Sequence, residues 1–170
     1  MSRVTIRIKG STIDEVIGTV SARIRHEMES RAWKAALELR NSSQIILRGQ
    51  RSGRRYKVPG TYRRQKDPTD GKAKNGRYYT ASAPGEPPAV RTGTFRNSWQ
   101  PSAHVTDKRY VSKIESDVMT DNGKYNLGEV LENGTKRMAP RPHHDRILQH
   151  AEQRIVRIYD QPYFSEETES

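Results

Sequence analysis

The sequence predicts an α+β protein: a small antiparallel sheet packed with one long N-terminal helix and a C-terminal helix, plus a long basic β-hairpin arm. Apolar and polar residues alternate at 3–9, as in a half-buried strand. Apolar residues recur at three- and four-residue steps over about 12–42 and about 143–160, as in amphipathic helices. Residues 48–91 show neither pattern. The resulting order of elements is typical of an α+β fold.

The length of 170 residues predicts one domain, placed at 1–164, followed by a loose acidic tail at 165–170. The chain has 31 Lys+Arg against 20 Asp+Glu and a formal net charge of +11. Only 32% of the residues are hydrophobic, so the core is expected to be small for the length. Much of the chain is therefore expected in loops, arms or contacts with partners.

Composition also argues against several classes of protein. The apolar stretches are only a few residues long, so no membrane span is expected. The first ten residues, MSRVTIRIKG, lack the apolar region of a secretory signal. The chain has no cysteine, which excludes disulfides, thiolate metal sites and cysteine nucleophiles. We therefore expect a product that stays in the cytoplasm where it is made.

The long helix is predicted to begin near Thr12, which has capping-box spacing to Glu15. Gly10 separates it from the strand at 3–9. One apolar stripe runs along its first half, formed by Ile13, Val16, Ile17, Val20, Ile24 and Met28. A long helix with so narrow a stripe suits packing on a sheet or on a neighbouring subunit.

Residues 48–91 are predicted to form a basic hairpin arm and a proline-rich connector. The arm has strands near 54–58 and 77–81 and a polar tip around DPTDGKAKNG. The proline-rich stretch 83–90 follows, and it is expected to be a rigid, extended connector that contributes nothing to the core. The remaining elements are a short helix or turn after Gly93, a strand through Tyr110 and Ile114, a turn at 121–123, a short helix or strand over 125–133, and the helix at about 143–160.

Positive charge is concentrated in the arm. From Arg48 to Arg96 the chain has 13 basic and three acidic residues, nearly the whole excess of charge. The residues expected to face DNA or an acidic partner are Arg48, Arg51, Arg54, Arg55, Lys57, Arg63, Arg64 and Lys66. Tyrosines stand among them, and such a mixture can hold phosphates and stack on bases. A solvated arm and an arm docked on an acidic subunit fit the composition equally well.

His143-His144-Asp145 is the one obvious metal or acid–base cluster in the sequence. Adjacent side chains do not face one site on a helix, and no second group of ligands stands at a suitable spacing. We therefore expect a solvated helix start, with no metal, cofactor or catalytic residue. No nucleophile elbow frames a serine, and no phosphate-binding loop is present.

Two segments carry a family resemblance. Residues 81–98, ASAPGEPPAVRTGTFRNS, and residues 130–142, VLENGTKRMAPRP, resemble in order and spacing two blocks of tailed-bacteriophage tail-completion, or neck, proteins. These are of the lambda minor tail protein Z type and of the type of the gene-ten product of phage HK-ninety-seven. The matching positions of the first block, expected to connect subunits, are Pro84, Gly85, Pro87, Pro88, Thr92, Gly93 and Arg96. Those of the second block, a turn motif, are Glu132, Gly134, Thr135, Met138, Pro140, Arg141 and Pro142.

The resemblance implies a structural virion protein and not an enzyme. Family members form a ring, sixfold by expectation, around the DNA channel at the head–tail junction. The implied partners are further copies of the chain, a head-completion or adaptor protein, a tail-terminator or tail-tube protein, and double-stranded DNA bound without sequence preference. This chain has His143-His144 where the family has Phe-Leu. The alternatives are a sequence-independent nucleic-acid-binding protein and a metal-dependent nuclease that uses His143, His144 and Asp145.

Overall fold

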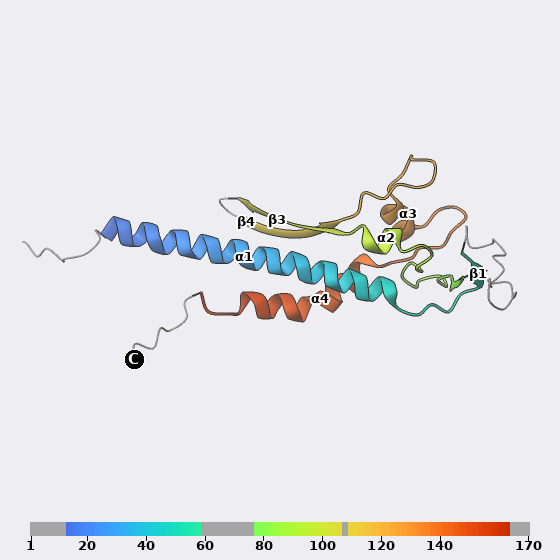
Figure 1. The fold of residues 1–170 in the computed structure, drawn as a ribbon, viewed down its shortest axis with the longest axis horizontal. Helices are drawn as coiled ribbons and strands as arrows, with labels where there is room; N and C mark the ends of the chain where they lie inside the picture. The colour runs from blue at the N-terminus through green and yellow to red at the C-terminus, as the bar shows by residue number, and fades with distance from the viewer. Residues whose placement is uncertain (1–12, 59–76, 107–108, 164–170) are drawn as a thin grey trace, which may run out of the picture.

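A computed structural model describes residues 13–58, 77–106 and 109–163 of the chain. Helix α1 (Ile13–Arg48) forms the central layer, between the antiparallel strands β3 (Gln100–Thr106) and β4 (Arg109–Glu115) on one side and helix α4 (His144–Tyr159) on the other (Figure 1). The smaller elements are β1 (Arg55–Lys57), β2 (Tyr78–Thr80), α2 (Thr94–Asn97) and α3 (Leu127–Asn133). The predicted α+β class is confirmed, with two separate two-stranded sheets. The strand predicted at 3–9, the hairpin tip and the acidic tail lie outside the described residues.

Helix α1 is longer than predicted. The sequence predicted an end near 42, but the helix continues to Arg48. Ser42 and Ser43 are both buried, and the Ser43 hydroxyl donates to the Arg40 carbonyl at 2.7 Å. The Ser42 hydroxyl lies 2.9 Å from His150 Nδ1 on α4. Serine ends a helix when its hydroxyl competes for the backbone, and here both hydroxyls have partners within the folded helix layer.

Small side chains allow α1 and α4 to approach closely. Ala32, Ala35 and Ala36 on α1 are fully or almost fully buried, as is Ala151 on α4. Alanine at a helix contact brings the backbones together and costs no side-chain entropy. Ile147 on α4 is also buried, and the contact forms the centre of a core made mostly of small residues. This agrees with the low apolar content of the chain.

The sheet on α1 was only half predicted. The expected strand through Tyr110 and Ile114 is confirmed as β4, whereas β3 was missed. Strand β3 begins Gln100-Pro101, and proline argues against a strand in sequence. In the fold Pro101 is paired with Ile114, and the residues that the structure describes form this sheet from two strands. The Ser112 hydroxyl of β4 donates to the Ala32 carbonyl at 2.7 Å, which joins the sheet to α1.

The proline-rich connector differs from the prediction. It contains a turn at which Gly85 has a φ of 78° and the Glu86 N–H donates to the Ala83 carbonyl at 3.1 Å. Pro87 and Pro88 are buried. The expectation of an extended connector without a share in the core is therefore wrong, because the chain turns at Gly85 and these prolines are buried.

The other predicted elements are confirmed. Strands β1 and β2 pair antiparallel, with Tyr56 opposite Tyr79, and form the base of the predicted hairpin. Gly93 precedes α2, as predicted. The segment 125–133, predicted as a short helix or strand, contains helix α3, which the Asn126 side chain caps. Helix α4 begins within one residue of its predicted start. Among the described residues no helix has the length and apolarity that crossing a membrane requires.

Candidate functional site

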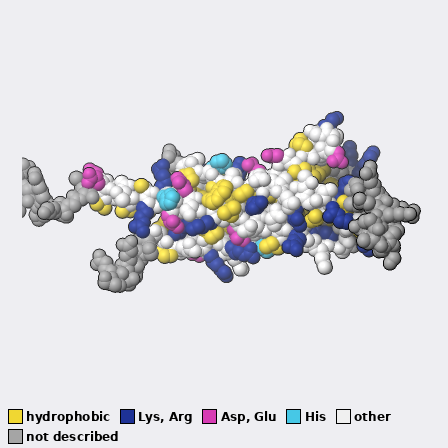
Figure 2. Space-filling model, in the orientation of Figure 1, with side chains coloured by type: hydrophobic (Ala, Val, Ile, Leu, Met, Phe, Trp, Pro, Cys, Tyr) yellow, Lys and Arg dark blue, Asp and Glu magenta, His cyan; other side chains and the backbone are white. Residues whose placement is uncertain are grey.

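The base of the hairpin presents cations on aromatic rings. The Arg55 guanidinium lies 4.6 Å from the Tyr78 ring centroid, and Lys57 Nζ lies 5.7 Å from the same ring. Arg54 lies 5.7 Å from the Tyr56 ring. The strands carrying these residues are mostly exposed, at the end of the molecule where Figure 2 shows many Lys and Arg side chains. Such a surface can bind phosphates or carboxylates. Arg63, Arg64 and Lys66 of the predicted arm lie outside the described residues.

Arg51 does not belong to this cationic surface. Its Nε donates to the Pro87 carbonyl at 2.6 Å, and its Nη2 donates to the carbonyls of Pro88 and Ile46 at 3.1 and 2.8 Å. Burial is the main cause that lowers the pKa of Arg51. Its guanidinium holds the connector against the end of α1. We correct the expectation that Arg51 faces DNA or a partner, because its donors already have partners within the chain.

The two segments that carry the family resemblance lie against each other. The Arg141 guanidinium donates to the carbonyls of Ser82 and Ala83, and the Gly85 N–H donates to the Pro140 carbonyl at 3.2 Å. Arg146 of α4 donates to the Gly85 carbonyl at 3.0 Å. The hydrogen-bond partners of the Arg141 guanidinium in the described structure are therefore backbone carbonyls. The connector is thereby fixed to the turn between α3 and α4.

Both segments also line one open pocket of about 610 Å³. Its wall includes predicted site residues from the two segments, namely Pro88, Thr92, Gly93, Arg96, Met138 and Arg141. Glu132, Gly134, Thr135, Pro140 and Pro142 are not part of this wall. Gly134 ends α3 with a φ of 74°, a conformation that favours glycine. Thr135 and Met138 form an isolated bridge in the turn that follows.

Glu86 joins the connector to the residues that lead into the hairpin. Its carboxylate accepts from the Ser52 hydroxyl at 2.6 Å and from the N–H groups of Ser52 and Ala83 at 3.1 and 2.8 Å. These hydrogen bonds, the Ser52 hydroxyl first, lower the pKa of Glu86 from 4.5 to about 2. A lowered pKa means that the stabilisation is present above about pH 4.5 and is lost as the pH falls through 2.

Replacing Ser52 with alanine is expected to raise the pKa of Glu86 towards 4.5, because the largest cause of its lowering is removed. The measurement is an NMR titration of the Glu86 side-chain carboxyl in both proteins. An unchanged pKa in Ser52→Ala would show that the two backbone donors alone hold the carboxylate.

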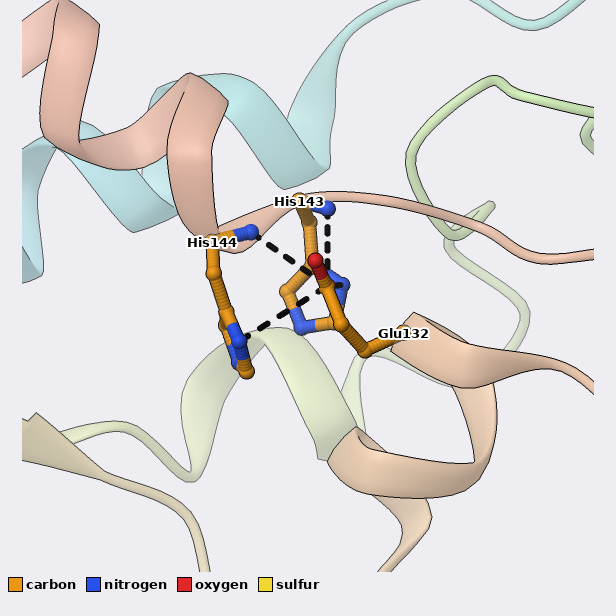
Figure 3. Close-up of side chains that lie close together, drawn as sticks. All are labelled: Glu132, His143 and His144. Atoms are coloured by element: carbon orange, nitrogen blue, oxygen red, sulfur yellow. Dashed lines mark hydrogen bonds and ion pairs between the residues drawn. The ribbon is translucent and has the colours of Figure 1, made fainter.

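A cluster of three possible metal ligands lies at the junction of α3 and α4 (Figure 3). Glu132 Oε2 accepts from the backbone N–H groups of His143 and His144 at 2.9 and 3.3 Å, so it caps the start of α4. The same oxygen lies 2.7 Å from His143 Nδ1 and 3.8 Å from His144 Nδ1. Both histidines therefore converge on one carboxylate oxygen.

His143 is fully buried, whereas the side chain of His144 is 48% exposed. The ring of His143 makes T-shaped contacts with Phe95 and Trp99, at 5.6 and 5.8 Å between centroids. Burial is the main cause that lowers the pKa of His143, so the ring is neutral at pH 7. Its Nδ1 faces two acceptors, Glu132 and the Arg141 carbonyl at 3.0 Å, and therefore carries the proton. Its Nε2 is buried without a hydrogen-bond partner in the described structure.

This cluster corrects the sequence analysis, which found no further ligand near the two histidines. Glu132 is that ligand, brought to them by the turn after α3. His143 precedes α4 and does not share its helical geometry, so the argument about adjacent helical side chains does not hold for it. Asp145 is exposed and is not one of the three ligands. An acid eleven residues before a histidine pair, across Gly134 and two prolines, was the available signal.

At the other end of the molecule, the first half of α1 projects beyond β3, β4 and α4 (Figure 1). Every residue from 13 to 26 is exposed, including the predicted apolar stripe as far as Ile24, whereas Met28 at the end of the stripe is half-buried. The exposed fractions fall along the stripe, from 76% at Ile13 to 57% at Ile17 and 38% at Ile24. Figure 2 shows hydrophobic side chains on this projecting part. Helix α1 therefore meets the rest of the protein from about Met28 onward, where the Tyr163 hydroxyl contacts the Met28 sulfur.

Comparison of the chain with protein-family models, with curated proteins and with solved structures finds no match.

Proposed function

We propose that this chain is a structural, non-enzymatic protein of the tailed-phage virion. Copies of it form a ring, sixfold by analogy, around the DNA channel at the head–tail junction, and they allow a filled head to join a tail. Its partners are a head-completion or adaptor protein on one side and a tail-terminator or tail-tube protein on the other. The observation that carries the proposal is the exposed apolar stripe on the projecting half of α1.

Single exposed apolar side chains are common, but this stripe is continuous. Ile13, Ile17, Val20 and Ile24 recur at the spacing of one helix face and are between 38% and 76% exposed. An amphipathic face of this kind is stable when it is covered by another surface. An assembly subunit supplies that cover from a neighbour, whereas a stand-alone enzyme has no such requirement.

The opposite end of the molecule supports the same proposal. The hairpin with its cationic surface leaves the body beyond the C-terminal end of α1, far from the stripe (Figure 1). Two unlike surfaces at opposite ends suit head-to-tail contacts, and such contacts close into a ring when the rotation between neighbours permits it. The two segments that resemble the neck family are meanwhile fixed to each other through Arg141, so the body between those surfaces is held as one piece. In this arrangement the arm contacts the DNA in the channel or an acidic surface of the neighbouring ring.

The test is complementation of a phage that carries this sequence with the reading frame interrupted. Without the protein, filled heads and separate tails are expected to accumulate, as counted by electron microscopy. The variant Ile17→Glu with Val20→Glu alters only exposed residues, so its circular dichroism and melting temperature should match the wild type. Each carboxylate should cost a buried contact about 2 kcal/mol, and joining should fall by about three orders of magnitude.

The matched control is Thr19→Glu with Ala22→Glu, which adds the same charge on the other side of the same exposed helix turns. It should complement like the wild type. Two results would count against the proposal: joined particles at normal titre from the interrupted phage, or absence of the protein from purified particles. Full complementation by the stripe variant would show that the stripe is not an assembly contact.

A further inference from the structure

We propose that Glu132, His143 and His144 bind one divalent transition-metal ion, with zinc the best match to the ligands. This site is independent of the proposed function, because it rests on geometry at the α3–α4 junction and not on the resemblance. One ligand atom from each residue lies within 4.8 Å of the other two. A carboxylate with two imidazoles is a frequent ligand set for zinc and related ions.

The two separations that involve Glu132 suit a single ion. Zinc lies about 2.0–2.2 Å from nitrogen and oxygen ligands, so two ligands of one ion are at most about 4 Å apart. Glu132 Oε2 and His144 Nδ1 are 3.8 Å apart, and Oε2 and His143 Nδ1 are 2.7 Å apart. Without an ion, Glu132 Oε2 and His143 Nδ1 share a proton. The ion would take the place of that proton, with a small outward shift of the carboxylate.

The proton balance of this step is simple. The neutral His143 ring has one proton, held on Nδ1 between Glu132 and the Arg141 carbonyl. When the ion binds Nδ1, that proton moves to Nε2 of the same ring, and none is lost to solvent. Nε2 is the atom that is buried without a partner in the described structure. The described structure offers this nitrogen no partner with or without the ion, so the ligand separations, and not Nε2, support the site.

The surroundings hold the ligands in place before an ion arrives. His143 is packed between Phe95 and Trp99, and its ring centroid lies 4.5 Å from that of His144. Glu132 is held by the two N–H groups at the start of α4. His144 is half exposed, so an ion can enter from solvent and keep a fourth position for water. Bound there, the ion would tie the end of α3 to the start of α4 beside Arg141.

The experiment uses the full chain, prepared without a histidine tag and dialysed against a chelator. Calorimetric titration with zinc is expected to show one ion per chain, and cobalt is expected to give the visible absorption of a low-symmetry site. Glu132→Gln keeps the acceptor that caps α4 but removes the charge, and His144→Asn alters an exposed ring. Each should weaken zinc binding by about 100-fold, because the loss of a ligand costs at least as much as the loss of its supporting contacts.

The control variants are His104→Asn and His26→Asn, which remove exposed histidines far from the cluster in sequence. They should leave zinc affinity and stoichiometry unchanged. Zinc should also raise the melting temperature of the wild type and not that of Glu132→Gln. The proposal is overturned by the absence of stoichiometric binding of zinc or cobalt to the wild type. It is equally overturned by a loss of binding in the controls that matches the loss in Glu132→Gln.

Discussion

Replacing Arg31 with alanine is expected to lower the free energy of unfolding by about 3–5 kcal/mol, the usual cost of removing one partner from a buried charged network. Arg31 on α1 is completely buried. Its guanidinium donates to the carbonyls of Tyr159, Gln161 and Pro162 at 3.1, 2.6 and 2.8 Å, and it pairs with Glu27 at 3.1 Å. The alanine variant would leave the end of α4 without these donors and would open a cavity beside it.

The matched control is Arg154→Ala. Arg154 on α4 pairs with Glu38 on α1 across the same helix contact, but its side chain is 47% exposed. An exposed pair contributes about 0–1 kcal/mol, so this variant should unfold close to the wild type in urea. Arg31→Lys should lower the free energy of unfolding almost as much as Arg31→Ala, because an ammonium group cannot reach three carbonyls from one position. Equal urea midpoints for Arg31→Ala and Arg154→Ala would contradict this account of α4.

Replacing Arg141 with alanine is expected to release the connector from the α3–α4 turn and to lower the free energy of unfolding by about 1.5–3 kcal/mol, the range of hydrogen bonds to a charged group. The lost bonds run from its guanidinium to the carbonyls of Ser82 and Ala83. The first measurement is urea unfolding. The second is amide exchange at Gly85, whose N–H donates to the Pro140 carbonyl and should exchange faster once the connector is free.

Arg137→Ala is the control for this prediction, since Arg137 is exposed in the same turn and has the same charge. It should change neither the urea midpoint nor the exchange at Gly85. Protection of Gly85 that is unaltered in Arg141→Ala would mean that Arg51 and the buried prolines hold the connector without help. In that case the hydrogen bonds between segments 81–98 and 130–142 would follow from the packing of the connector and would not be what holds it in place.

The helices and the hairpin base could be predicted because their signals are local. The capping pair Thr12 and Glu15, the period of the apolar residues and the turn glycines all act within a few residues. The end of α1 and the strand β3 could not, since each depends on a partner distant in sequence. Ser42 stays helical beside His150 of α4, and β3 exists because β4 pairs with it on the surface of α1. Local preference is a weak guide wherever tertiary contacts decide.

In the candidate sites, too, the residues with local signals were predicted, and the contacts between residues distant in sequence were not. In the sequence, Arg51 is indistinguishable from the other cations of the basic segment. Only the structure shows that its guanidinium donates to the Pro87 and Pro88 carbonyls within the chain. His143 and His144 were visible in the sequence, but their carboxylate was not. A turn containing Gly134 and two prolines sets the distance to Glu132, and no rule of helix or strand spacing applies across it. The remaining arm residues, 63–66, lie outside the described ranges and stay a prediction.

The division of α1 into a packed half and a projecting half has a consequence for how this protein gains affinity. Residues 13–26 form about four turns, close to the length at which an isolated helix is only marginally stable in water. Gly18 lies within this half and weakens it further. A neighbour that covers the stripe must therefore also suppress fraying of this half, so part of the contact energy goes into helix order. In the proposed ring, one such contact would be reversible, and the assembly would become durable only when several of these contacts form together.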